Sequence, residues 1–334
     1  MNNRQRMSGT RDIGRWTRAV ALCLMSFAFP VVGMAGITLP EGIGGTVQTL
    51  YPKDPVLLPT DAKRAKNRFF NAVGELAKAA DEDKLVTLAG DLGYTLFSGK
   101  GLKREFEFGG EFVGFDNLPA SNALADSLYK ILHSHVDEAL KTLATIPAPN
   151  KWSGSFELLP ENILELLGLM DDIPEELQDV NVDWGDVYAV EGGLKALQGV
   201  LCFLKGCDLS DDIGPIIQTF IDAETPFDLN AAFAAIPQAI RGVRDASQTA
   251  KANACLKEAV EFIKKADAWM RTRGDGKRHL IGYGAEDGQH LLTLPADDPI
   301  VDVIRANIDK LISAFDGPVA FDVKDIIGQL DPTS

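Results

Sequence analysis

Long segments with apolar side chains at helical spacing constrain the fold of this chain more than any other feature of its sequence. Residues 121–146 form the clearest such segment. Their apolar side chains recur three or four positions apart: Leu124, Leu128, Ile131, Leu132, Val136, Leu140 and Leu143. A stripe of this kind is typical of a helix that buries one face against a neighbour. Ser121 or Asn122 is expected to cap the segment, and Pro147 to end it.

Further helices are expected on both sides of this segment. Thr60 caps a helix over 61–80, and residues 81–101 predict a second helix that Gly99 and Gly101 close. This pair resembles a tetratricopeptide-like hairpin, although no repeat recurs at a fixed period. Residues 228–274 predict one long helix or two consecutive helices with a kink at Pro237, and residues 297–315 predict a final helix.

Two shorter segments indicate β-structure. In residues 103–115, Phe106 and Phe108 alternate with glutamates, and Gly109-Gly110 predicts the turn of a hairpin. Residues 274–294 are expected to form a loop or a short hairpin. The fold class is therefore mostly α: an irregular multi-helix bundle of helical hairpins with one or two small β-hairpins.

The first 35 residues have the order of a secretory signal peptide. Five arginines precede an apolar run of about 17 residues, and Gly33 and Ala35 suit a cleavage site. A membrane anchor is the alternative, but Pro30 interrupts a run that is short for a stable span. We expect an exported protein, periplasmic or secreted. Its segments are then 36–60 as an extended lead-in, 61–148 as an N-terminal helical subdomain with a small β-hairpin, and 149–334 as a C-terminal helical subdomain.

Charge narrows the classes of partner. The first 35 residues carry a net charge of +4 and the whole chain −15, so residues 36–334 carry −19. An acidic surface repels nucleic-acid phosphates and anionic lipids. We therefore expect no nucleic-acid partner, and no stable membrane span after cleavage because no second long apolar segment is present. A protein partner remains compatible with this composition.

Residues 181–207 combine an acidic and aromatic head with a long apolar helix. Capping explains the head, because Asp183 or Asp186 can accept hydrogen bonds from the amides of the first helical turn. The alternative is a binding site. If the chain has one, we expect its residues to be Asp183, Trp184, Asp186 and Tyr188.

Three cysteines follow the signal segment. In an oxidising compartment we expect a disulfide between Cys202 and Cys207, with the chain folding back at Gly206. Pairing of either with Cys255 is the alternative. Zinc binding by the C-x4-C pair is a third, weaker interpretation because no histidine lies nearby.

The histidines and short motifs give no catalytic pattern. His133 and His135 are two positions apart on a helix and are expected to face different sides, whereas His279 and His290 could meet across a hairpin. Residues 208–219 lack the glycine and glutamate of a calcium loop. No phosphate loop, nucleophile elbow or metalloprotease motif occurs. We expect no cofactor and no metal.

One resemblance rests on residues 182–197. The matching residues are Asp183, Gly185, Asp186, Val187, Tyr188, Ala189, Leu194, Ala196 and Leu197. They resemble uncharacterised exported bacterial helical proteins in which a D-x-G-D-V-Y-A segment opens a long helix. The resemblance extends loosely over 60–325, and this chain departs from it at Gly192-Gly193. It implies an exported, mostly helical protein and no activity.

Three functional hypotheses follow. The first is a non-enzymatic exported protein that binds a protein partner or scaffolds the cell envelope. The second is a binding protein for an apolar small molecule held between helices and under the 103–115 segment. The third is a hydrolase with an unrecognised site, which a cluster of buried histidines and aspartates in a cleft would favour.

Overall fold

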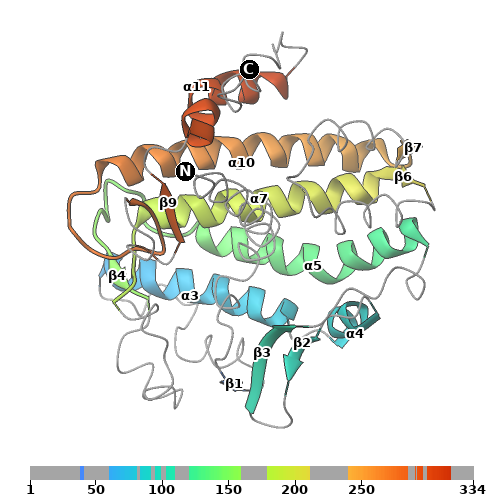
Figure 1. Cartoon of the computed structure of the whole chain (residues 1–334), viewed down its shortest axis with the longest axis horizontal. Helices are drawn as coiled ribbons and strands as arrows, with labels where there is room; N and C mark the ends of the chain where they lie inside the picture. The colour runs from blue at the N-terminus through green and yellow to red at the C-terminus, as the bar shows by residue number, and fades with distance from the viewer. Residues whose placement is uncertain are drawn as a thin grey trace, which may run out of the picture. The chain divides into compact units, whose positions relative to one another are not determined.

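The computed structural model describes residues 38–40, 60–80, 83–91, 95–98, 103–109, 120–158, 179–210, 240–284, 290, 292–295 and 299–316. These residues form a mostly helical protein with small β-sheets, in which helices pack against each other, so the predicted fold class is confirmed (Figure 1). The predicted signal peptide lies outside the described residues.

The chain divides into two compact units, each assembled from separated parts of the sequence. Unit 1 contains, among the described residues, 38–40, 73–80, 83–91, 95–98, 103–109, 120–139, 196–210 and 240–252. Unit 2 contains 60–72, 140–158, 179–195, 253–284, 290, 292–295 and 299–316. Each of the four long helices α3 (Asp61–Ala80), α5 (Ser121–Leu143), α7 (Trp184–Gly206) and α10 (Ala246–Thr272) contributes residues to both units. The predicted segment boundaries stay predictions.

Unit 1 contains a three-stranded antiparallel sheet with the order β1-β3-β2. Its strands are β1 (Thr38–Pro40), β2 (Thr95–Ser98) and β3 (Lys103–Gly109), and α4 (Asp83–Asp91) lies beside β2 (Figure 1). Thr38 pairs with Glu105, and Phe97 pairs with Phe106. A second antiparallel pair joins β6 (Cys207–Leu209) to β7 (Ile240–Val243).

Three sequence predictions in unit 1 are corrected. The helix predicted over 81–101 ends at Asp91, because Thr95, Leu96 and Phe97 favour a strand over a further helical turn. The strand predicted from residue 103 exists, but β1 and β2 are its partners, and residues 110–119 lie outside the described residues. Residues 240–243 form β7, so one continuous helix over 228–274 is excluded and α10 begins at Ala246, whereas residues 228–239, with the kink expected at Pro237, lie outside the described residues.

The side chain of Asn122 holds β6 against the start of α5. Its amide nitrogen donates to Asp208 Oδ1 (2.7 Å), and its Oδ1 accepts the backbone N–H of Leu209 (2.9 Å). Asn122 is thus used for a long-range contact instead of the predicted cap, and Ala120 supplies the carbonyl that accepts the first helical amides. Behind this contact Ala125, Cys207 and Leu209 form a small buried core.

Unit 2 contains two further strand pairs and α11 (Pro299–Ala314). The strands β4 (Phe156–Glu157) and β5 (Asn181–Val182) are antiparallel, whereas β8 (Ile281–Gly284) and β9 (Leu292–Pro295) are parallel. The hairpin predicted within 274–294 is therefore wrong in its strand direction. Backbone bonds from residues 278–280 to Asn181 help to position β8.

The core of unit 2 is aromatic. Phe69, Phe70, Trp152 and Phe156 are buried, and Trp152 stacks on Phe156 with ring centroids 5.7 Å apart. The Phe69 and Phe156 rings meet edge to face at 5.7 Å. The segment that follows α5 therefore contributes residues to the core. The predicted Thr60 cap of α3 is confirmed, because Thr60 Oγ1 accepts the backbone N–H of Lys63 at 3.2 Å.

The glycines of α7 allow its close approach to α10 within unit 2. A Cβ at Gly192 would lie 3.3 Å from the carbonyl oxygen of Ala259 and 3.3 Å from Ile263 Cγ1. Figure 1 shows the two helices side by side. Gly192, which is a poor helix former, is thus explained by helix packing.

The predicted Cys202–Cys207 disulfide is not formed. Cys202, Cys207 and Cys255 are buried, and these described cysteines form no disulfide with one another. The helix α7 ends at Gly206, as the prediction required, but the chain does not fold back there. Cys207 instead opens β6 and pairs with Val243 of β7.

Among the described helices, α7 alone has the length and hydropathy that a membrane crossing requires, and 56% of its apolar window is buried inside the fold. The core helix of a bundle has the same properties. Asp186 and Glu191, both buried within the N-terminal part of α7, favour the role of a core helix.

Gly206 gives the first testable prediction. A Cβ there would lie 2.7 Å from Thr249 Cγ2 and 2.8 Å from the Thr249 backbone nitrogen, which cannot rotate away. Gly206→Ala should lower the free energy of unfolding by about 1–3 kcal/mol. Gly90→Ala is the control, because it meets nothing within 4 Å in α4 and should add about 0.5–1 kcal/mol. Equal effects in chemical denaturation would contradict the packing argument.

Candidate functional site

Two aspartates at the start of α7 cap the helix reciprocally. Asp183 Oδ1 accepts the backbone N–H groups of Gly185 (2.8 Å) and Asp186 (3.3 Å). In return, Asp186 Oδ2 accepts the backbone N–H of Asp183 (2.9 Å). This is the arrangement of a capping box, with aspartate at both positions. The predicted capping role is confirmed, and both residues contribute to it.

The same two carboxylates also bind Arg273, which follows α10. The Arg273 guanidinium contacts Asp183 at both oxygens, through Nη2 to Oδ1 (2.6 Å) and Nε to Oδ2 (2.8 Å). Its Nη2 also lies 3.0 Å from Asp186 Oδ2, and its Nη1 donates to the backbone carbonyl of Ile281. The Arg273 side chain is 10% exposed. A bidentate, largely buried pair of this kind is geometrically specific.

His279 completes the arrangement from the other side. It is fully buried, its Nδ1 lies 3.3 Å from Asp186 Oδ2, and its Nε2 lies 3.2 Å from both oxygens of Asp275. Each ring nitrogen faces a carboxylate, so both nitrogens have to donate, and this geometry corresponds to the imidazolium form. We call Asp183, Asp186, Arg273, Asp275 and His279 the ion cluster.

Within the ion cluster, the pKa values of Asp183 and Asp186 are shifted in opposite directions. Burial would raise the pKa of Asp183, but hydrogen bonds and charge from Arg273 outweigh it and lower that pKa. The pKa of Asp186 is raised by its complete burial, which outweighs the opposing effects of His279 and Arg273. Burial also tends to lower the pKa of His279, yet the hydrogen bond to Asp186 and the nearby carboxylates raise it. The Asp186–His279 pair therefore keeps its shared proton to a higher pH in the folded protein than the two separate groups would.

Close packing at the cluster depends on a glycine. A Cβ at Gly185 would lie 2.7 Å from Arg273 Nη2 and 3.0 Å from Trp269 Cδ1. The indole nitrogen of Trp269 donates to Asp183 Oδ2 (3.1 Å). The glycine in the D-W-G-D head therefore makes room for groups that arrive from α10 and the residues after it.

Aromatic side chains flank the cluster. Trp184 is buried, and its Nε1 donates to the backbone carbonyl of Trp152 (2.9 Å). Its ring lies 4.9 Å from that of Tyr188, which lies 6.3 Å from Phe262. The four residues predicted as a binding site thus divide: Asp183 and Asp186 belong to the ion cluster, whereas Trp184 and Tyr188 belong to the packing beside it.

Sequence reasoning did not identify Trp269, Arg273 or Asp275 as part of this site. They lie about 90 residues beyond Asp183, and the sequence predicts residues 274–294 only as a loop or a short hairpin. The expectation that His279 and His290 meet is confirmed, because their ring centroids lie 6.0 Å apart. His290 Nδ1 accepts the backbone N–H of His279 (3.1 Å). A neutral His290 therefore carries its proton on Nε2.

Ligand atoms of Asp183, Asp186 and His279 lie within 4.8 Å of one another, a spacing that suits a metal ion. In this structure the Arg273 guanidinium contacts both carboxylates and supplies the positive charge between them. A metal would have to displace it. We assign the three side chains to the ion cluster and not to a metal site.

The other predicted histidine pair behaves as expected. His133 Nε2 lies 2.8 Å from Lys251 Nζ, and its ring stacks on Tyr129 at 4.4 Å. His135 lies instead toward Glu75, with 3.9 Å between Nδ1 and Oε2. The two rings have different partners, so the predicted divergence is confirmed.

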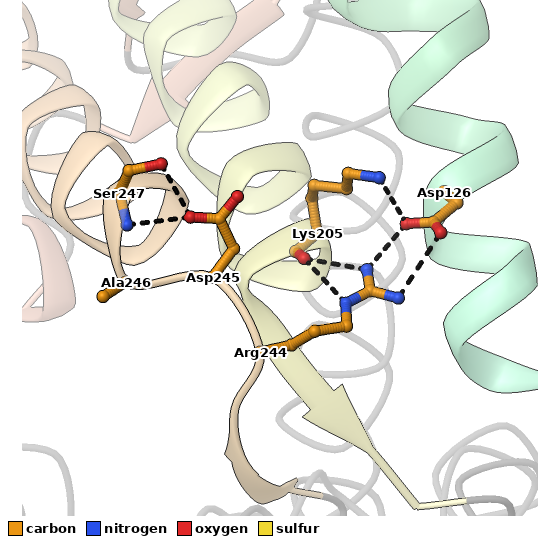
Figure 2. Close-up of a pocket in the computed structure, with 6 residues that line it drawn as sticks. All are labelled: Asp126, Lys205, Arg244, Asp245, Ala246 and Ser247. Atoms are coloured by element: carbon orange, nitrogen blue, oxygen red, sulfur yellow. Dashed lines mark hydrogen bonds and ion pairs between the residues drawn. The ribbon is translucent and has the colours of Figure 1, made fainter.

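Unit 1 has a shallow, open depression of about 510 Å³, shown in Figure 2. Asp126 Oδ1 lies 2.6 Å from Arg244 Nη2 and 2.8 Å from Lys205 Nζ. Asp245 accepts the backbone N–H of Ser247 (2.9 Å) and caps α10. Asp126, Lys205 and Arg244 thus pair with one another, and Asp245 serves as a cap, so these charged groups support the junction of α5, α7 and the residues after β7.

Glu191, one turn beyond Tyr188 on α7, is buried with an exposed fraction of 6%. Burial raises the pKa of Glu191 to about 7, although Lys265 and Lys195 act in the opposite direction. Glu191 also contributes to the raised pKa of Tyr188, after burial of the phenol itself. Ionised Glu191 is therefore a cost to the folded protein above neutral pH.

Replacing Arg273 tests the ion cluster. Arg273→Met leaves two buried carboxylates without their cation and should lower the free energy of unfolding by about 3–5 kcal/mol. Arg271→Met is the matched control: its side chain is 45% exposed and pairs only with Asp267 at 3.3 Å, which should contribute about 0.5 kcal/mol. Urea denaturation of both variants distinguishes them, and equal losses would refute a stabilising role for the cluster.

Replacing Glu191 tests its pH dependence. The folded pKa exceeds the ordinary value of 4.5, so stability is lost as pH rises from there through about 7. Glu191→Gln should stabilise the protein by up to about 3 kcal/mol at about pH 8, by about 1 kcal/mol near pH 5 and by almost nothing near pH 4. Glu258→Gln is the control for the loss of an acidic partner of Lys195, because the Glu258 side chain is about half exposed. A flat profile for Glu191→Gln would be the contrary result.

Comparison with known proteins adds no relative: no family model, no curated protein and no solved structure matches the chain.

Proposed function

We propose that this chain is an exported, non-enzymatic helical protein that binds a protein partner through an apolar ridge on α7. The ridge consists of Val200 and Phe203, each 38% exposed. They lie three positions apart, so they are neighbours on one face of the helix. The adjacent Leu201 and Cys202 are buried, so this part of α7 packs on one side and presents apolar side chains on the other.

The ion cluster supports a structural role for the D-W-G-D head. Each of its five side chains contacts another member, and Asp186 and His279 are fully buried. A substrate would have no access to His279. Capping and ion pairing thus account for Asp183 and Asp186, which the sequence had offered as binding residues. We therefore place the candidate binding surface on the C-terminal half of α7 and not at its start.

The hydrolase alternative gains one observation, because buried histidine and aspartates do cluster. The proton positions argue against it. Both nitrogens of His279 face carboxylates, and His290 Nδ1 accepts a backbone amide. A neutral His290 therefore presents a protonated Nε2, which cannot accept a proton from a nucleophile. The small-molecule alternative stays a prediction, since the 103–115 segment that motivates it is described only through residue 109.

The charge of the chain defines the chemistry of the partner. An acidic chain of net charge −15 attracts basic surfaces over the Debye length. We infer a polypeptide partner that places apolar side chains on Val200 and Phe203 and carries lysines or arginines around them. Export follows from the basic and apolar order of residues 1–35 and from the resemblance to exported helical proteins, and both remain part of the proposal.

The test is photo-crosslinking in intact cells of the source organism. A benzoyl-phenylalanine in place of Phe203 should give a discrete adduct with another protein. Adding Val200→Asp should abolish this adduct while changing the free energy of unfolding by no more than about 0.5 kcal/mol. The control position is Ile263 on α10, which is 45% exposed and should give no such adduct. The intact mass of the purified chain should equal that of residues 36–334, which begin at Gly36.

No adduct from position 203, an equal adduct from 263, or an adduct between two copies of this chain would each contradict the proposed partner. A mass that includes residues 1–35 would contradict export.

A further inference from the structure

We propose that Asp186 and His279 form a pH-sensitive clasp that holds β8 against the start of α7. The clasp closes when the pair carries the imidazolium proton and loosens when that proton is lost. The proposal goes beyond partner binding, because it concerns a conformational change within unit 2.

The clasp rests first on how β8 is attached. Ile281 donates its backbone N–H to Asp186 Oδ1 (2.8 Å), and His279 Nδ1 lies 3.3 Å from Asp186 Oδ2. Both oxygens of this single, fully buried carboxylate therefore contact the 279–281 segment. Backbone bonds from Asn181 to Arg278 (2.8 Å) and from Leu280 to Asn181 (3.1 Å) continue the attachment. Asp186 is thus the point at which the segment meets α7.

The second step concerns the charges that face the pair. Asp183 lies 3.8 Å from His279 Nδ1 on the α7 side, and Asp275 faces Nε2 from the loop after α10. Arg273 contacts Asp183 and Asp186, and His290 faces the backbone N–H of His279 from the segment before β9. With His279 protonated, two cations face three acidic side chains. With His279 neutral, Arg273 alone balances them.

The third step is the consequence of deprotonation. A neutral imidazole has one nitrogen that only accepts hydrogen bonds, and in this geometry that nitrogen would face a carboxylate. Because His279 is fully buried, water cannot separate the two lone pairs without a local opening. The least costly opening moves the 279–284 segment away from Asp186, since this releases the histidine and the Ile281 amide together.

The sign of the pH dependence follows from the directions of the shifts. A histidine whose folded pKa is raised contributes stability that is complete below its ordinary value of about 6.5 and is lost as pH rises through the folded value. The raised pKa of Asp186 acts in the same direction, whereas Asp183 and Asp275 lose their contribution only under acidic conditions, because their pKa values are lowered. The clasp therefore opens on the alkaline side.

The experiment is amide hydrogen exchange by NMR on the full mature chain, with rates corrected for base catalysis. Protection of the Ile281 amide should fall at least about tenfold between about pH 6 and pH 9. Leu209 is the internal control: its amide donates to Asn122 Oδ1 at 2.9 Å, an acceptor that does not titrate, and its protection should stay constant. In the same samples, the ring signals of His279 should report a pKa above the ordinary histidine value of about 6.5.

The variant His279→Gln separates the clasp from ordinary packing. A glutamine amide is neutral at every pH, so the part of the pH dependence that comes from His279 should disappear, and the protection of Ile281 should fall by clearly less than in the wild type. The proposal is overturned if the wild-type Ile281 profile is flat, if His279 titrates below the ordinary value, or if His279→Gln keeps the wild-type profile. Should the variant fail to fold, the wild-type titration with its Leu209 control decides alone. Loss of the Phe203 crosslink would not affect any of these readouts.

Discussion

The contact between Arg273 and the two aspartates of α7 is the interaction on which the described part of unit 2 depends. Burying a carboxylate is costly unless it is paired and hydrogen-bonded, and Asp186 is fully buried. Arg273 reduces that cost for both aspartates at once, because it binds Asp183 through two nitrogens and reaches Asp186 with one of them. Such a cluster contributes little net stability compared with an apolar core, yet its bidentate contact is geometrically specific and positions the residues after α10. The same carboxylates cap α7, so the start of the helix and the docking of β8 are determined together.

The protonation states within this cluster complement one another instead of acting alike. Asp183 and Asp275 stay ionised because arginine, histidine and backbone donors surround them, whereas Asp186 and His279 compete for protons in a buried space. Glu191, two turns inside the N-terminal half of α7, adds a second group that is costly to ionise. Both the Asp186–His279 pair and Glu191 therefore favour mildly acidic over alkaline conditions, and the ionised aspartates set the limit on the acid side. The N-terminal half of α7 is thus the part of the described structure in which pH and packing are most closely linked.

Sequence patterns predicted what local chemistry determines. Helices α5, α7 and α11 follow from apolar periodicity, and the caps at Thr60 and Asp183 follow from residue type alone. Three features could not be predicted, because each depends on residues distant in the chain. Arg273 and His279 lie about 90 residues from the carboxylates they bind, and nothing in the sequence of residues 273–279 indicates that pairing. Asn122, a good capping residue by type, is used instead to hold β6. The Cys202–Cys207 disulfide was expected because the helix ends at Gly206, and α7 does end there, but Cys207 enters β6, whose partner β7 is distant in the sequence.

The functional interpretation rests on two unusual features: charged side chains that are buried and apolar side chains that are exposed. Buried charge and exposed apolar side chains both cost free energy, so each needs a physical reason. The buried charge of unit 2 has its reason within the described residues, since Asp183, Asp186, Arg273 and His279 satisfy one another. The described residues give no such reason for the exposure of Val200 and Phe203, because the helix already packs through the buried Leu201 and Cys202. Removing apolar area from water is favourable by about 25 cal/mol per Å², so a partner that covers this ridge gains from it without disturbing the ion cluster. Under the proposed function, the ridge that a partner would cover and the ion cluster that positions β8 therefore consist of different residues.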